Sequence, residues 1–236
     1  MLSVWRRELQ SYFVTAIGWV FLCVFLTLAS VLFYLEILRQ RSSDLLTFIG
    51  EMSYLWMLLT PVLTMRLLAE ERQKRTDQLL LTNPLSVAGI VLGKYAAAVT
   101  VMLISVACGS AYVLLVAHAG RVWPGEVLVG ALGFVLQGCA FIAMDLFISG
   151  LCRTPVTAAV ASFGANFTLW LMDLLASSAP AWLSGALGFL SLYSRNEPFL
   201  MGQLSFASML WDLSFAAAFL LLAMHSLAGR TRKGRS

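Results

Sequence analysis

The chain has 236 residues, of which 60% are hydrophobic and only 12% are charged. A soluble domain usually carries about 25% charged residues, so the composition excludes an ordinary soluble protein and indicates an integral membrane protein. The formal net charge of +4 does not indicate a nucleic-acid partner, because the basic residues gather at the ends of apolar runs and form no single stripe.

Residues 1–13 place Arg6, Arg7 and Glu8 among apolar and aromatic side chains. This pattern is typical of an amphipathic helix at the membrane surface. The apolar run that follows, residues 14–35, is longer than the core of a signal peptide and is followed by no small-residue cleavage site. We therefore expect a first span that stays in the protein.

Five further apolar runs are long enough for the spans of about 20 residues that a bilayer requires. We expect these spans at residues 51–68, 90–116, 127–148, 156–176 and 206–227. Pro61 lies inside the second span and is expected to kink it, because proline removes one backbone hydrogen bond. Pro155 fits the first position of the fifth span.

Residues 177–205 are too interrupted by proline and glycine for a span and too apolar for a free loop. We expect short helices that lie in, or dip into, the outer membrane interface. The sequence as a whole predicts an all-α polytopic membrane protein of six spans, forming one domain over residues 1–236.

The basic residues predict the orientation of the chain. If both termini lie inside, 12 of the 16 Lys and Arg residues fall on inner segments and 4 on outer ones. Inner segments of membrane proteins carry the excess of Lys and Arg. We therefore expect both termini, and the segment between the second and third spans, to face the cytoplasm.

That segment, within residues 60–94, is the most charged stretch between two spans. Its charged and polar part contains Glu70, Glu71, Arg72, Lys74, Arg75, Thr76, Asp77 and Gln78, and its apolar part contains Leu79, Leu80, Leu81 and the turn residue Pro84. We expect a short amphipathic surface helix broken by the proline. The leucines can anchor a partner, and the charges can form a rim that fixes partner choice.

At these residues the sequence resembles the ABC-2 type permeases, most closely the gliding-motility type, whose pattern reads roughly PxLTMRxLAEERxxGTxELLLTxPxSxxxIVLGK. The similarity extends to the start of the chain and to the stretch LFISGLCRTPVTAAVASF. Two positions depart from the pattern: Arg75 stands where the family usually has Gly, and Gln78 where it has Glu.

The resemblance implies the membrane subunit of an ATP-driven exporter in the bacterial inner membrane. Residues 70–86 would be the coupling helix, which docks into a separate ABC ATPase subunit. ATP and Mg would be bound by that ATPase. The resemblance also implies a second permease copy as a partner, and it leaves open whether an auxiliary periplasmic protein joins the complex. The substrate is left open.

The chain itself shows no motif of an enzyme. The stretch from Gly89 to Tyr95 differs from a phosphate-binding loop, because only three residues separate its glycines and Tyr95 follows Lys94. The four cysteines form no CxxC pair, and His118 and His225 are far apart. We expect no catalytic residue, metal or cofactor in this chain.

Asp145, Asn166 and Asp173 are polar residues that lie within apolar spans. A charge costs about 2.5–3.5 kcal/mol at the middle of a membrane on insertion scales. Asp145 is expected near the inner end of the fourth span and Asp173 near the outer end of the fifth. At such positions an aspartate can either pack beside a helix end or a basic residue, or have a functional role. Asn166 should find a hydrogen bond on another helix.

Two other functions remain open from the sequence. One is a membrane scaffold or assembly subunit that transduces force and moves no substrate. The other is an ion- or proton-coupled carrier that uses Asp145 and Asp173. Transport that stops when the ATPase is inactive, together with a tolerated Asp145→Asn substitution, would exclude the carrier.

Overall fold

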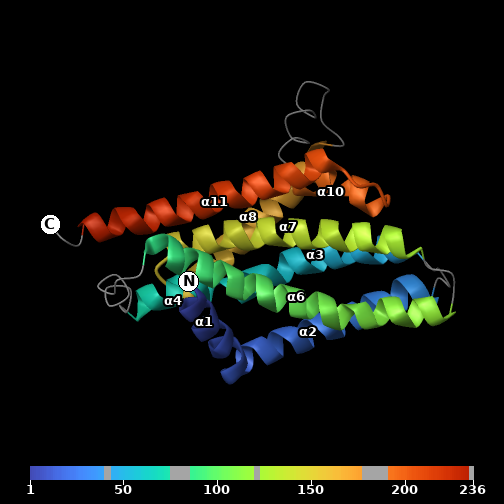
Figure 1. The fold of residues 1–236 in the computed structure, drawn as a ribbon, viewed down its shortest axis with the longest axis horizontal. Coiled ribbons are helices and arrows are strands. Elements are labelled where there is room, and N and C mark those ends of the chain that lie inside the picture. Colours follow the sequence, from blue (N-terminus) through green and yellow to red (C-terminus); the bar gives the residue numbers. More distant parts are fainter. Residues whose placement is uncertain (40–43, 75–85, 120–122, 177–190, 234–236) are drawn as a thin grey trace.

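The structure, a computed structural model, describes residues 1–39, 44–74, 86–119, 123–176 and 191–233. In this part of the chain every regular element is helical, and six helices are long and apolar enough to cross a membrane. The long helices run lengthwise beside one another (Figure 1). The predicted all-α fold with six spans is confirmed.

The spans are α2, α3, α6, α7, α8 and α11, and shorter helices lie before, between and after them. In chain order the helices are α1 (Leu2–Val14), α2 (Ala16–Phe33), the π-helix η1 (Tyr34–Arg39), α3 (Leu45–Thr64), α4 (Arg66–Gln73), α6 (Val87–Ala119), α7 (Pro124–Leu151), α8 (Pro155–Ala176), α10 (Leu192–Leu200) and α11 (Phe206–Lys233).

Helix α3 begins six residues before the expected start of the second span. The carboxylate of Asp44 accepts hydrogen bonds from the backbone N–H groups of Leu46 and Thr47. An aspartate in this position caps a helix, because it satisfies N–H groups that have no partner within the helix. The expected start of the second span at residue 51 was therefore wrong, because residues 45–50 belong to the same helix.

The expected amphipathic helix at the N-terminus is confirmed as α1, and it is fastened to the bundle. The Trp5 indole N–H donates to the Thr100 hydroxyl at 3.0 Å, and the Tyr12 hydroxyl donates to the Leu63 carbonyl at 2.7 Å. Burial, assisted by the nearby Glu8 carboxylate, raises the pKa of Tyr12. The phenol therefore keeps the proton that it donates to α3.

Helix α7 lies in the interior, in contact with α3, α4, α6, α8, α10 and α11. Phe141, Ile142 and Leu146 are fully buried on it. Two glycines allow close approach. A Cβ at Gly133 would lie 2.6 Å from the Phe199 Cβ of α10, and one at Gly138 would lie 2.4 Å from the Met102 sulfur of α6.

The stretch before the last span contains α10, which confirms a short helix there. The Ser191 hydroxyl caps α10 by accepting from the backbone N–H groups of Tyr193 and Ser194. The hydroxyls of Ser191 and Ser194 also donate to the Asp173 carboxylate, at 2.7 and 2.6 Å. Asp173 thus ties the end of α8 to the start of α10. Residues 177–190 of the expected interfacial stretch lie outside the described residues.

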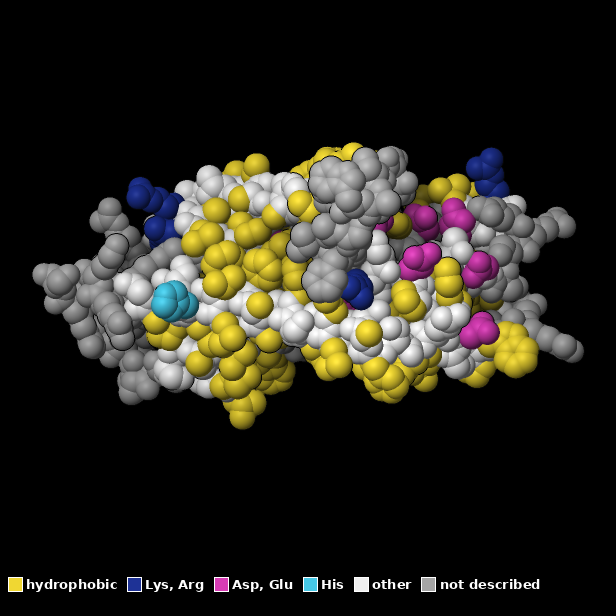
Figure 2. Space-filling view, turned by 90° about the horizontal axis from the view of Figure 1, so that it is seen from above, with side chains coloured by type: hydrophobic (Ala, Val, Ile, Leu, Met, Phe, Trp, Pro, Cys, Tyr) yellow, Lys and Arg dark blue, Asp and Glu magenta, His cyan; other side chains and the backbone are white. Residues whose placement is uncertain are grey.

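The spans alternate in direction, so the start of α2 and the end of α11 lie at the same end of the bundle as α4 (Figure 1). This agrees with an even number of spans. Hydrophobic side chains spread over the middle of the face shown in Figure 2, while acidic side chains gather near the end opposite the end of α11. Large exposed hydrophobic residues lie on α2, α6, α8 and α11, as expected of surfaces that face lipid.

Replacing Gly133 by Ala should destabilise the fold. The added methyl group would overlap Phe199 and Asn196, and overpacking of this kind costs about 1–3 kcal/mol. Gly164→Ala is the matched control, since a Cβ there meets nothing within 4 Å. Thermal unfolding in detergent should show a lower midpoint for Gly133→Ala alone. Equal midpoints would contradict the packing of α10 on α7.

Candidate functional site

The expected docking segment starts on α4, directly after a break in the helix that α3 begins. Pro61 has no N–H group, and the helical path is interrupted four residues later at Met65. The Ser149 hydroxyl of α7 inserts at this point. It donates to the Met65 carbonyl at 3.1 Å and accepts from the Leu68 and Ala69 N–H groups at 3.3 and 3.2 Å.

Ser149 thus inserts into the helical hydrogen-bond pattern at the junction of α3 and α4. In a straight helix the Leu68 N–H would donate to the Thr64 carbonyl, and here it donates to the Ser149 hydroxyl. A side chain that inserts into a helix in this way is a recognised cause of a helix kink. The direction of α4 therefore depends on α7 as well as on Pro61.

A buried lysine fixes α4 to two other helices. The Lys94 side chain, on α6, is 1% exposed. Its ammonium group pairs with Glu8 of α1 at 3.0 Å and with Glu71 of α4 at 2.9 Å. Arg7 approaches the same two carboxylates, at 3.0 and 3.2 Å. Three segments that are far apart in the sequence thus meet at one group of charges.

The charged residues of α4 are also engaged within the chain. Glu70 pairs with Arg66 and with Lys74, each four residues away along the helix. The Arg72 guanidinium donates to the Leu151 and Cys152 carbonyls at 2.7 and 3.1 Å. These carbonyls end α7, and a cation there satisfies unpaired acceptors and the negative end of the helix dipole.

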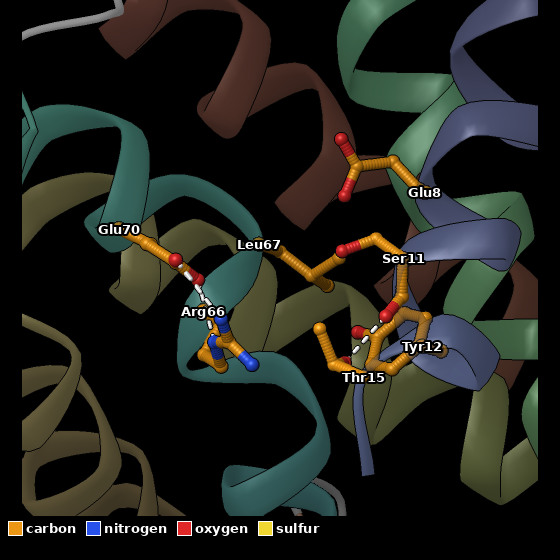
Figure 3. Close-up of a pocket in the computed structure, with 7 residues that line it drawn as sticks. All are labelled: Glu8, Ser11, Tyr12, Thr15, Arg66, Leu67 and Glu70. Atoms are coloured by element: carbon orange, nitrogen blue, oxygen red, sulfur yellow. Dashed lines mark hydrogen bonds and ion pairs between the residues drawn. The ribbon is translucent and has the colours of Figure 1, made fainter. Parts of the chain in front are cut away.

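A small crevice separates α1 from the junction of α3 and α4. Figure 3 shows Glu8, Ser11, Tyr12 and Thr15 on one side of it and Arg66, Leu67 and Glu70 on the other. Its volume is about 30 Å³, roughly the share of one water molecule in the liquid. The crevice is therefore no site for a nucleotide or a transported molecule.

The structure describes four of the expected docking residues, which are Glu70, Glu71, Arg72 and Lys74. The other seven, Arg75, Thr76, Gln78, Leu79, Leu80, Leu81 and Pro84, lie outside the described residues. Among the charges expected to form a rim, Glu71 and Arg72 bind other parts of this chain, and the exposed Lys74 pairs with Glu70. The docking role of the segment stays a prediction.

A second polar group lies deeper, between α3, α7 and α8. Because Pro61 cannot donate to it, the Met57 carbonyl has no helical partner four residues on. The Asn166 amide of α8 donates to this carbonyl at 3.2 Å and to the Asp145 carboxylate of α7 at 3.3 Å. The expected interhelical hydrogen bond of Asn166 is confirmed, and it brings Asp145 and Asn166 together.

Asp173 does not belong to this group, since it bonds to α10 at the other end of α8. The carrier alternative joined Asp145 and Asp173 in one path, whereas the structure gives them separate partners. Among the residues that the structure describes, no group of three or more His, Cys, Asp or Glu is placed to hold a metal ion.

Sequence reasoning missed three features of the interior. It treated Lys94 only as part of a motif, although a lysine within the third span was itself a signal for a buried ion pair. It passed over Asp212, which is 1% exposed on α11. It also passed over the Asn196 amide, which donates to the Gln137 carbonyl oxygen at 2.7 Å.

A large apolar cavity of about 630 Å³ lies between α2, α3, α6 and α7. The hydroxyls in its lining belong to Ser105, Ser110 and Tyr112, and each donates to a backbone carbonyl of the helices. The walls therefore offer apolar contacts and little free hydrogen bonding.

Comparison with known proteins places these features in a family. A family model described as ABC-2 family transporter protein matches residues 3–187, which is most of the chain. The matched region includes α1, the first five spans, α4 and the charged stretch after it. No curated protein matches the chain. The gliding-motility type remains a prediction.

Replacing Lys94 by Met should loosen the junction of α1, α4 and α6. The change gives a side chain of similar size but leaves Glu8 and Glu71, whose side chains are only 15% and 18% exposed, with the exposed Arg7 and without the buried cation between them. Removing one partner of a buried ion pair costs about 3 kcal/mol or more. Denaturant unfolding in detergent, followed by tryptophan fluorescence, measures this loss.

Lys74→Met is the matched control, because Lys74 is 64% exposed and its pair with Glu70 lies four residues away along the chain. A pair of that kind is worth about 0.3–0.5 kcal/mol. If both variants lost the same small amount, the Lys94 group would not hold the three helices together.

Proposed function

Since the chain belongs to the ABC-2 family of transporter proteins, we propose that it is the permease subunit of an ATP-driven exporter. A separate ABC ATPase would bind and hydrolyse ATP with its Mg. The family match over residues 3–187 carries this proposal. It is supported by the exposed end of α4, which leads into the charged stretch at one end of the bundle.

We propose that residues 70–86 dock on the ATPase. The contacts of α4 connect this segment mechanically to the spans. Glu71 joins α4 to α1 and α6 through Lys94, and Arg72 joins it to the end of α7. A displacement of the docking segment would therefore move α1, α6 and α7 together. Packed helices move as rigid bodies in this way and deform little.

The complete complex would contain two permease copies and two ATPases in the bacterial inner membrane. Both termini would face the cytoplasm, where ATP is available. An auxiliary periplasmic protein would be an additional partner. A scaffold that transduces force without moving a substrate would use the same docking segment, so transport by the reconstituted complex separates these two functions.

Replacing Leu79 and Leu80 together by Asp should release the ATPase from the complex. Truncating an anchor residue at an interface typically costs about 2 kcal/mol or more, and two buried carboxylates should exceed this. Insertion should be unchanged, because apolar runs elsewhere set the spans. Co-purification of the cognate ATPase at equal stoichiometry is the measurement.

Gln10→Asp, which adds a charge on the exposed face of α1, is the control and should retain the ATPase. If the leucine variant bound the ATPase at wild-type affinity, residues 70–86 would not be the docking element. If the pure chain hydrolysed ATP by itself, the proposal that a separate ATPase subunit hydrolyses ATP would be wrong.

The orientation is tested with single cysteines in a variant whose four native cysteines are replaced by Ser. Trp123 and Gln73 are both exposed. Trp123 directly precedes α7 and Gln73 ends α4, and the start of α7 and the end of α4 lie at opposite ends of the bundle (Figure 1). A cysteine at position 123 should react with an impermeant maleimide added from the periplasmic side. A cysteine at position 73 should react only after the membrane is opened. The reverse pattern would show that the orientation is inverted.

A further inference from the structure

The group around Asp145 contains more oxygen acceptors than donors. Asp145 is fully buried, and its Oδ1 atom has no hydrogen-bond partner among the described residues. The same holds for the Ser162 hydroxyl oxygen and the Asn166 Oδ1 atom, on residues that are 0% and 1% exposed. The hydroxyls of Ser162 and Thr64 face the Asp145 carboxyl.

The Asn166 and Thr64 donors are already used, and the Ser162 hydroxyl, which can still donate, carries no charge that could compensate the Asp145 carboxylate. The Asn166 amide nitrogen donates to the Met57 carbonyl and to Asp145 Oδ2. The Thr64 hydroxyl donates to the Thr60 carbonyl of its own helix at 2.9 Å. Oxygen acceptors without donors are costly in an apolar interior. What the group lacks is positive charge.

No described residue supplies this charge by forming an ion pair with Asp145. The ionisable side chains that the structure describes on the elements packed against α7 are Glu51 and Tyr54 of α3, Arg66, Glu70, Glu71 and Arg72 of α4, Lys94, Tyr95, Cys108, Tyr112 and His118 of α6, Asp173 of α8, Tyr193, Arg195 and Glu197 of α10, and Asp212 and His225 of α11. Arg66, at the start of α4, is paired with Glu70, and the buried Lys94 of α6 is paired with Glu8 and Glu71.

We propose that Asp145, Ser162 and Asn166 form a binding site for one monovalent cation, H⁺ or Na⁺, inside the bundle. The inference does not depend on the proposed docking function, since it concerns a different group of residues. It assigns a ligand to a carboxylate that would otherwise be an uncompensated charge in the membrane, where such a residue usually marks an ion or proton site.

The ligand set selects this class of cation. All the free atoms are oxygens, which are hard ligands suited to alkali and alkaline-earth ions and unsuited to soft transition metals. Only one of them carries a charge. A single positive charge therefore leaves the site neutral, whereas a divalent cation would leave an excess charge in an apolar interior.

The site is built by the defect in α3. Pro61 leaves the Met57 carbonyl free, this carbonyl fixes the Asn166 side chain, and Asn166 fixes Asp145. Asp145 is also one helical turn from Ser149, which holds the junction of α3 and α4. A cation bound here would stiffen the three helices directly beside that junction.

The sodium arm measures thermal unfolding of the purified full-length protein in detergent at alkaline pH, in NaCl and in choline chloride at equal ionic strength. Sodium should raise the midpoint of the wild type. Asp145→Asn, which keeps the shape but removes the charge, should abolish the effect, and Ser162→Ala should weaken sodium affinity about tenfold or more. Asp173→Asn, the matched control, should retain it.

The proton arm uses infrared difference spectroscopy at neutral pH in choline chloride. A protonated-carboxyl band that is lost in Asp145→Asn, but kept in Asp173→Asn, identifies the cation as H⁺. Sodium-dependent stabilisation that is lost in Asp145→Asn identifies it as Na⁺. If Asp145→Asn changes neither the sodium effect nor the protonated-carboxyl band, Asp145 is ionised without a bound cation and the proposal is overturned.

Discussion

The buried charge of Lys94 constrains the arrangement of the helices more than any other single group. An ammonium ion in an apolar interior must be compensated, and Lys94 is compensated by carboxylates that come from two different elements, Glu8 on α1 and Glu71 on α4. Apolar packing allows two helices to meet in many orientations. Glu8 and Glu71, by contrast, can both pair with Lys94 only when α1, α4 and α6 meet. The ion group therefore specifies which surfaces pack at this end of the bundle.

Helix α3 carries hydrogen-bond deficits that its neighbours satisfy. Pro61 frees the Met57 carbonyl, to which Asn166 of α8 donates, and the break at Met65 is bridged by Ser149 of α7. In lipid no water is available for such groups, so neighbouring helices must supply the partners. A proline in α3 thus produces specific contacts with α7 and α8, and it sets the direction in which α4 leaves the bundle.

The spans could be predicted from apolar runs because lipid imposes a minimum length on each of them. The start of α3 was misplaced because polar residues such as Glu51 continue a helix that Asp44 caps. The partners of Lys94 and Asn166 could not be predicted, because such contacts depend on packing between distant segments and leave no local periodicity. Asn166 could be expected to bond across helices, but Met57 could be identified only once α3 and α8 were placed together.

The same contacts bear on how a partner would recognise the docking segment. A charge can steer association when it is free at the surface, but Glu71 is paired with Lys94 and Arg72 is bonded to the end of α7. These two residues fasten the segment to its own chain. If the segment docks as proposed, recognition of a partner would depend on the residues after Lys74, the part of the sequence that contains both Arg75 and Gln78. Because these are the two departures from the pattern of the gliding-motility type, the surface offered to an ATPase would differ from that pattern at these two positions.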